Sequence, residues 1–105
     1  MGDNLPQLDQ LLAELIATPS VSSVDPHWDQ GNRGVIDLLA GWLEDLGFNC
    51  LVEPLAEQPH KANLIATLAP TGKGRGAGGG LALCGHTDTV PCNPELWRSN
   101  PFALS

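Results

Sequence analysis

The apolar residues in the first half of the chain recur at helical spacing in two separate stretches, and this pattern constrains the fold more than any other feature. In the first stretch, residues 4–17, they fall on one face of a helix, at Leu8, Leu11, Leu12, Leu15 and Ile16. Asn4 and Gln7 have the spacing of a capping box. Thr18-Pro19 ends the pattern, because the residue before a proline is disfavoured in the helical region. The sequence therefore predicts an amphipathic helix over residues 4–17.

The second stretch predicts another helix over residues 32–46. Its apolar residues again recur every three or four positions, at Val35, Leu38, Leu39, Trp42, Leu43 and Leu46. Gly47 follows directly, where a glycine commonly ends a helix.

Three short extended runs follow the helices, at residues 48–55, 63–68 and 81–84. Pro54 indicates an edge or the end of the first strand, since proline cannot donate a backbone hydrogen bond. The third run is apolar at every position, which is typical of a strand covered on both faces. Two helices followed by short strands, one of them fully buried, predict an α/β domain built in layers.

The charge balance argues against nucleic acid as a partner. The chain of 105 residues carries 5 Lys and Arg against 12 Asp and Glu, a formal net charge of −7. Phosphate binding needs clustered basic side chains. Those of this chain are scattered, at Arg33, Lys61, Lys73, Arg75 and Arg98.

Cysteine usage and hydropathy indicate the compartment. The chain has 3 cysteines, an odd number without Cys-x-x-Cys spacing, which is typical of free thiols in a reducing compartment. No apolar run approaches the roughly 18 residues of a transmembrane helix. The start, Met1-Gly2-Asp3-Asn4, does not have the pattern of a secretory signal. We therefore expect a cytoplasmic protein with no membrane partner.

A glycine-rich stretch, residues 69–80, separates the second and third predicted strands. It does not fit the phosphate-binding P-loop, because Gly72-Lys73 is followed by Gly74 where Ser or Thr is required. It does not fit the dinucleotide fingerprint either, since no helical pattern follows it. We expect a flexible connection between strands.

Two side chains able to take part in metal binding follow the third predicted strand. His86 and Asp88 come directly after Gly85, and ligands in open α/β sheets bind beyond the carboxyl ends of the strands. Imidazole is a good ligand for Zn²⁺ or Co²⁺, and a carboxylate commonly accepts a hydrogen bond from its other ring nitrogen. From spacing alone the alternative also stays open, that His86 is simply a hydrogen-bonded histidine at the end of a strand.

The remaining histidines and cysteines are expected to have no role in chemistry. His27 and His60 have no acidic or cysteine partner at a ligating spacing, so both are interpreted as loop residues. Cys84 is expected to be a small buried apolar residue. Cys92 is expected to be an exposed loop thiol, and the alternative of an oxidisable thiol or a stray metal ligand stays open.

Several motifs occur in a fixed order along the chain. The longest is Gly85-His86-Thr87-Asp88-Thr89-Val90-Pro91, continued by Trp97 and Pro101-Phe102. Upstream lie Leu15-Ile16-Ala17-Thr18-Pro19-Ser20-Val21-Ser22, Asp45-Leu46-Gly47-Phe48 and Lys61-Ala62-Asn63-Leu64. Together they resemble the first metal-site signature and the amino-terminal stretch of the M20 metallopeptidase/deacylase family. Within the family, the likeness is to a deacetylase of arginine biosynthesis, and it spans nearly the whole chain.

The resemblance implies a hydrolase that cleaves the amide of an N-acyl amino acid with two divalent metals, usually Zn²⁺ and replaceable by Co²⁺. It implies that His86 is a metal ligand and that Asp88 is the catalytic carboxylate that holds and polarises it. In such a site, a water shared between two cations becomes a nucleophile at neutral pH, and the scissile carbonyl is polarised. The glutamate that carries the proton and the other metal ligands are expected beyond Ser105.

The resemblance also implies that residues 1–105 are the amino-terminal part of a zinc-peptidase-like catalytic domain with a layered, mixed sheet. The rest of that domain and a smaller lid domain, through which these enzymes commonly dimerise, are expected outside the chain. We therefore expect a homodimer for the longer protein and an inactive chain for this part alone. Other family members, namely desuccinylases, aminoacylases and carboxypeptidases, stay open as alternatives. So does a different class, a non-catalytic fragment or pseudoenzyme.

Overall fold

The computed structural model describes residues 5–69 and 79–105. Along the chain the elements are α1 (Leu8–Ala17), α2 (Arg33–Asp45), β1 (Asn49–Pro54), β2 (Ala62–Thr67) and the short 3₁₀ helix η3 (Pro94–Leu96). Asn4, expected to cap the first helix, and most of the glycine-rich stretch at 69–80 lie outside the described residues.

Helix α1 confirms the first predicted helix with a later start. It begins after Gln7, whose backbone N–H donates to the side-chain Oε1 of Gln10 at 3.2 Å. It ends at Thr18, whose hydroxyl donates to the backbone oxygen of Glu14 at 2.6 Å. No residue of α1 is buried, so its apolar face is only partly covered by the rest of the described chain.

Helix α2 confirms the second predicted helix, including its end. Gly47 has φ of +96°, the left-handed conformation that favours glycine. Its N–H donates to the oxygen of Glu44 at 2.9 Å, and the N–H of Phe48 donates to the oxygen of Leu43 at 3.0 Å. These two bonds satisfy carbonyls that the helix end would otherwise leave without partners, and the chain turns directly into β1.

Strands β1 and β2 form an antiparallel hairpin, confirming the first two predicted strands. The register pairs Leu51 with Ile65 and Val52 with Leu64. Because side chains alternate along a strand, these pairs lie on opposite faces. Val52 and Leu64 are half-buried, whereas Leu51 and Ile65 are exposed.

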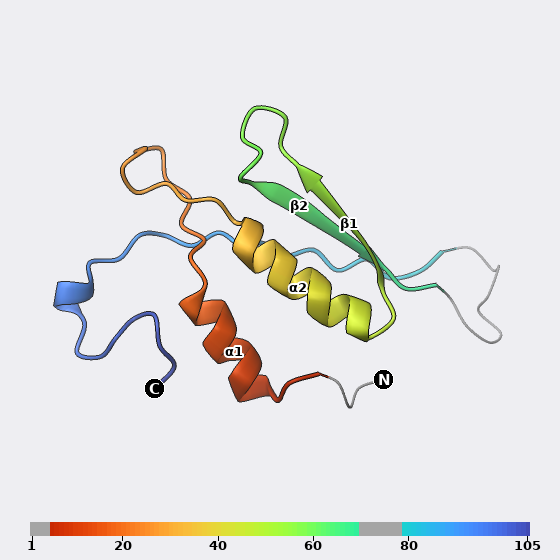
Figure 1. Ribbon diagram of the computed structural model, residues 1–105, viewed down its shortest axis with the longest axis horizontal. Helices are drawn as coiled ribbons and strands as arrows, with labels where there is room; N and C mark the ends of the chain where they lie inside the picture. The colour runs from red at the N-terminus through yellow and green to blue at the C-terminus, as the bar shows by residue number, and fades with distance from the viewer. Residues whose placement is uncertain (1–4, 70–78) are drawn as a thin grey trace.

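Helix α2 lies along one face of this hairpin (Figure 1). Among residues 5–69 and 79–105, the buried apolar side chains come from α2 and β2, namely Val35, Ile36, Ala40 and Ala62. The described residues therefore contain two α-helices and a two-stranded antiparallel sheet, with α2 packed on the sheet, which confirms the α/β class. In the part of the chain that the structure describes, the opposite face of the hairpin stays open.

The prediction of a third strand at residues 81–84 is wrong for the part of the chain that the structure describes. Residues 81–84 are not paired with another strand, and Leu81 and Leu83 are 86% and 89% exposed. Cys84, expected to be buried, is exposed as well. A strand that is apolar on both faces needs neighbours on both edges and cover on both faces, and the described residues supply neither. Residues 79–105 instead run as an extended trace that contains η3 (Figure 1).

Neither α1 nor α2 has the length and hydropathy of a helix that could cross a bilayer, and no other helix among residues 5–69 and 79–105 does.

Candidate functional site

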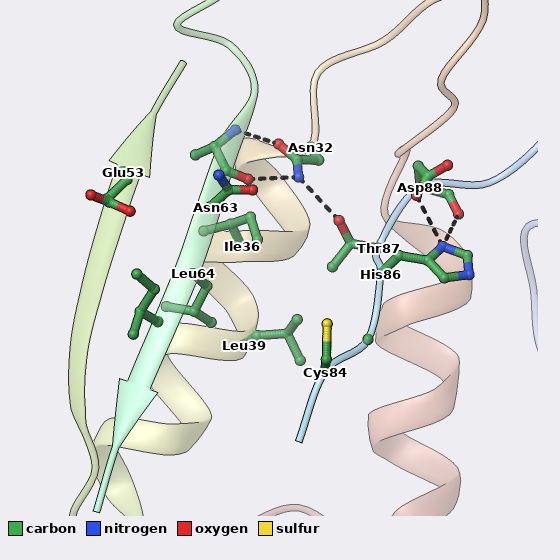
Figure 2. A pocket seen from close by; sticks show the side chains of 13 residues that line it. Asn32, Ile36, Leu39, Glu53, Asn63, Leu64, Cys84, His86, Thr87 and Asp88 are labelled. Atoms are coloured by element: carbon green, nitrogen blue, oxygen red, sulfur yellow. Dashed lines mark hydrogen bonds and ion pairs between the residues drawn. The ribbon is translucent and has the colours of Figure 1, made fainter. Parts of the chain in front are cut away.

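The two predicted site residues lie side by side on the extended segment that follows Gly85. The ring nitrogen Nδ1 of His86 lies 2.9 Å from Oδ1 of Asp88 and 3.2 Å from the backbone oxygen of Asp88 (Figure 2). Their side chains are 81% and 59% exposed. The carboxylate lies beside the imidazole, two positions along the chain.

This contact assigns the hydrogen on the ring. Both groups that face Nδ1 are oxygen acceptors, so Nδ1 carries the hydrogen and donates it. In the neutral imidazole, the other nitrogen, Nε2, then keeps its lone pair. A histidine held in this way can offer Nε2 to a divalent cation, and the carboxylate behind it makes the ring a stronger donor.

One histidine does not complete a metal centre. Within residues 5–69 and 79–105, no three His, Cys, Asp or Glu side chains come close enough together to hold an ion. A catalytic zinc takes about three protein ligands. The donor set of the described chain therefore fits one ligand and its orienting carboxylate, and further ligands would have to come from elsewhere.

The segment that carries His86 is anchored by its two threonines. The hydroxyl of Thr87 accepts a hydrogen bond from Nδ2 of Asn32 at 3.0 Å. Thr89 is held through its backbone: its N–H donates to Ser20 at 2.9 Å, and its oxygen accepts from the N–H of Ser22 at 3.0 Å. The two backbone bonds of Thr89 form a parallel bridge between Val21 and Thr89. The loop after α1 therefore holds the site segment in place.

A groove of about 640 Å³ separates the site segment from the hairpin. Its walls come from α2, from β2 and from the segment itself, and Figure 2 shows Ile36, Leu39 and Leu64 opposite Cys84 and Thr87. His86 and Asp88 lie at one side of this groove. The groove is apolar along α2, at Ile36 and Leu39. Figure 2 shows the paired side chains of His86 and Asp88 on the side of the segment that faces away from α2.

An ion pair connects the loop after α1, which holds the backbone of Thr89, to the hairpin. Nζ of Lys61 lies 2.8 Å from Oδ1 of Asp29, which also accepts the backbone N–H of Ser23 at 2.9 Å. The Lys61 ammonium, followed by the Ser23 N–H, lowers the pKa of the Asp29 carboxyl below its usual value. Lys61 belongs to the motif Lys61-Ala62-Asn63-Leu64, and in the structure its ammonium ties the loop after α1 to the hairpin.

The remaining histidines and thiols lie away from this pair. His27 and His60 are exposed loop residues, as expected. Cys92, expected to be exposed, is half-buried. Burial raises the pKa of the Cys50 thiol, and the charge of Glu44 raises it further, so Cys50 is not an activated nucleophile.

Sequence reasoning missed Asn32, which it treated only as the start of a helix. The side chain of Asn32 bonds to Ala62 and to Thr87, residues 30 and 55 positions away. The only local signal is a side chain able to cap a helix, and that signal does not reveal long-range partners.

Comparison with curated proteins finds relatives along the whole chain. It is 49% identical over 105 residues to the acetylornithine deacetylase of Photorhabdus laumondii, and 48% to that of Klebsiella pneumoniae. It is 46% identical over 105 residues to that of Yersinia pestis. The chain spans about a quarter of the length of these relatives, 26% of the first two and 27% of the third. No family model matches it. The likeness to a deacetylase, expected from the motifs, is confirmed.

Proposed function

We propose that this chain is part of an acetylornithine deacetylase of the M20 metallopeptidase/deacylase family. Such an enzyme hydrolyses N2-acetyl-L-ornithine to acetate and L-ornithine in arginine biosynthesis. The observation that carries the proposal is the identity of 46–49% over all 105 residues to deacetylases of this name. In this proposal, residues 1–105 contribute the first part of a layered, mixed-sheet catalytic domain, and the rest of the longer protein completes it.

His86 and Asp88 are the residues of this chain to which the proposal gives a chemical role. Two divalent cations, Zn²⁺ or Co²⁺, would when bound activate a water and polarise the amide carbonyl. His86 would hold one of them through Nε2. Asp88 keeps the proton on Nδ1, which leaves the lone pair on Nε2 and fixes the direction of the ring. The 2.9 Å contact between Nδ1 and Oδ1 supports this division of roles.

The proposed function also implies a substrate class, an oligomeric state and a compartment for the longer protein. The substrate is a small N-acyl amino acid, and the longer protein is a cytoplasmic homodimer. Nucleic acid is not a partner, because the net charge is −7 and the basic residues are scattered.

Two alternatives remain to be separated by experiment. A succinyl-diaminopimelate desuccinylase, an aminoacylase or a carboxypeptidase of the same family would use the same two residues. A non-catalytic role for the chain by itself is favoured by a different observation, that a cluster of three ligands is absent from residues 5–69 and 79–105. We accordingly expect the 105-residue chain alone to bind zinc weakly and to release no ornithine.

The test uses the full-length protein that carries this stretch, purified and loaded with Zn²⁺ or Co²⁺. We expect release of ornithine from N2-acetyl-L-ornithine, with weaker turnover of succinyl-diaminopimelate and other N-acyl amino acids. His86→Ala removes a ligand and should cost one bound metal and nearly all turnover. Asp88→Asn removes the orienting charge and should keep most of the metal while slowing turnover about 10–100-fold.

His27→Ala is the matched control, because His27 is an exposed histidine in another loop. It should leave both the metal content and the rate unchanged. Turnover by His86→Ala at the wild-type rate would refute the role of His86. A preference for another acyl group would move the assignment to a different member of the family.

A further inference from the structure

The side chain of Asn32 does not cap helix α2, although Asn32 is the residue directly before the helix. As the residue before α2, an asparagine usually accepts a hydrogen bond from a backbone N–H of the first helical turn. The side chain of Asn32 makes no such cap. Its Oδ1 instead accepts from the N–H of Ala62 at 2.8 Å, and its Nδ2 donates to the oxygen of Ala62 and the hydroxyl of Thr87, both at 3.0 Å. Both amide hydrogens are therefore directed at residues far away in the sequence.

These three bonds need an amide. One end of the group must accept from Ala62, and the other end must donate twice. A carboxylate would place an oxygen against the Ala62 carbonyl, and an aliphatic side chain would make none of the bonds. Asn32 thereby joins the start of α2, the start of β2 and the site segment, as Figure 2 shows.

Thr87 stands between the two proposed site residues and is turned the other way. It is half-buried, whereas His86 and Asp88 are exposed. Side chains alternate along an extended segment, so a fixed Thr87 side chain directs those of His86 and Asp88 to the opposite side. Thr89 is fixed through its backbone by Ser20 and Ser22, and Asp88 is thus held from both sides.

We propose that Asn32 is a positioning residue: through the hydroxyl of Thr87 it sets the orientation in which His86 donates from Nδ1 to Asp88. This inference rests on the proposed function for its consequence, because an oriented His86 offers Nε2 to the metal. The tautomer of the His86 ring beside Asp88 does not depend on the proposed function and can be measured in the metal-free protein.

The sharpest variant is Thr87→Val in the full-length protein, because valine keeps the shape and removes the acceptor for Asn32. Histidine ¹⁵N NMR of the metal-free protein reports the proton on the His86 ring. We expect the wild type to show Nδ1 protonated, Thr87→Val to show a mixture of the two tautomers, and Thr87→Ser to restore the wild-type spectrum. The Kd for Zn²⁺, measured by competition with a chelator, should rise about 10–100-fold in Thr87→Val and stay near wild type in Thr87→Ser.

Thr89→Val is the control in the same segment, because Thr89 is held through backbone atoms. It should change neither the tautomer nor the Kd. The link to Asn32 is tested by Asn32→Ala combined with Thr87→Val. If Asn32 acts through Thr87, adding Thr87→Val to Asn32→Ala raises the Kd no further, whereas fully additive losses would overturn the link.

The outcomes separate this inference from the proposed function. A wild-type tautomer and Kd in Thr87→Val would overturn the positioning role, even in an enzyme that hydrolyses acetylornithine. A shifted tautomer in a protein without deacetylase activity would support the positioning role while the proposed function fails.

Discussion

Helix α2 with its hairpin and the extended segment 79–105 are held in place by different forces. The first supplies the buried apolar side chains of the described chain, whereas the second contributes none and exposes Leu81 and Leu83. Hydrophobic burial fixes the first. A few hydrogen bonds, from Asn32 and from the loop after α1, fix the second. An apolar pattern therefore decides structure only where the elements that would cover it are present in the chain.

The largest expected effect contrasts two aliphatic residues. Ile36 is 3% exposed and Leu83 is 89% exposed. Ile36→Ala should lower the free energy of unfolding by about 2–4 kcal/mol, from lost burial and the cavity left behind. Leu83→Ala should change it by less than about 0.5 kcal/mol. Urea unfolding of the 105-residue chain measures both values.

The same pair of variants can also break the contrast. If Leu83→Ala costs as much as Ile36→Ala, residues 81–84 are buried as their apolar pattern predicts. If the proposed layered catalytic domain is right, Leu83→Ala should cost as much as Ile36→Ala in the full-length protein, because residues 81–84 would then be covered.

A smaller effect compares two glycines of the ordered region. Gly47 needs its left-handed conformation, so Gly47→Ala should destabilise the chain by about 1–2 kcal/mol. Gly41 lies inside α2, and an added Cβ there would meet nothing within 4 Å. Gly41→Ala should therefore stabilise the chain by about 0.5–1 kcal/mol. Changes of the same sign in thermal unfolding would contradict the assigned end of α2.

The smallest effect concerns the ion pair that ties the loop after α1 to the hairpin. Because the pKa of Asp29 is lowered in the folded chain, its stabilising contribution is fully present above the unfolded pKa of about 3.9. It is lost as the pH falls through the lower folded pKa. The difference in urea midpoint between the wild type and Asp29→Asn should be constant from about pH 5 to 7 and shrink below about pH 4. A difference that persists at pH 2 would contradict this.

The two helices and the first two strands could be predicted because their signals are local, whereas the pairing of the strands came from the structure. The spacing of Val35, Leu39 and Trp42 marks a helix, and Gly47 marks its end within the same few residues. The run at 81–84 carries an equally clear apolar signal, but a buried strand is defined by neighbours rather than by itself. Among the described residues no such neighbours cover 81–84, so the apolar run alone predicted a strand that the structure does not contain.

The candidate site also contains one part that the sequence indicates, His86 and Asp88, and one part that it does not, Asn32. His86 and Asp88 could be singled out from the sequence by their spacing of two after an apolar run, and the structure places the two side chains in contact. The metal role of the pair stays a prediction. Asn32 could not be found in this way, because its bond to Thr87 joins positions 55 residues apart, and no local pattern encodes such a partner.

That separation has a consequence for the order of folding. A contact between residues so distant must overcome the entropy of closing a long loop, whereas α2 and the hairpin form from near neighbours. We expect the helix and hairpin to assemble early and the bond from Asn32 to Thr87 to close late. Among the described residues, the His86 imidazole would then reach its orientation only after α2 and the hairpin have formed.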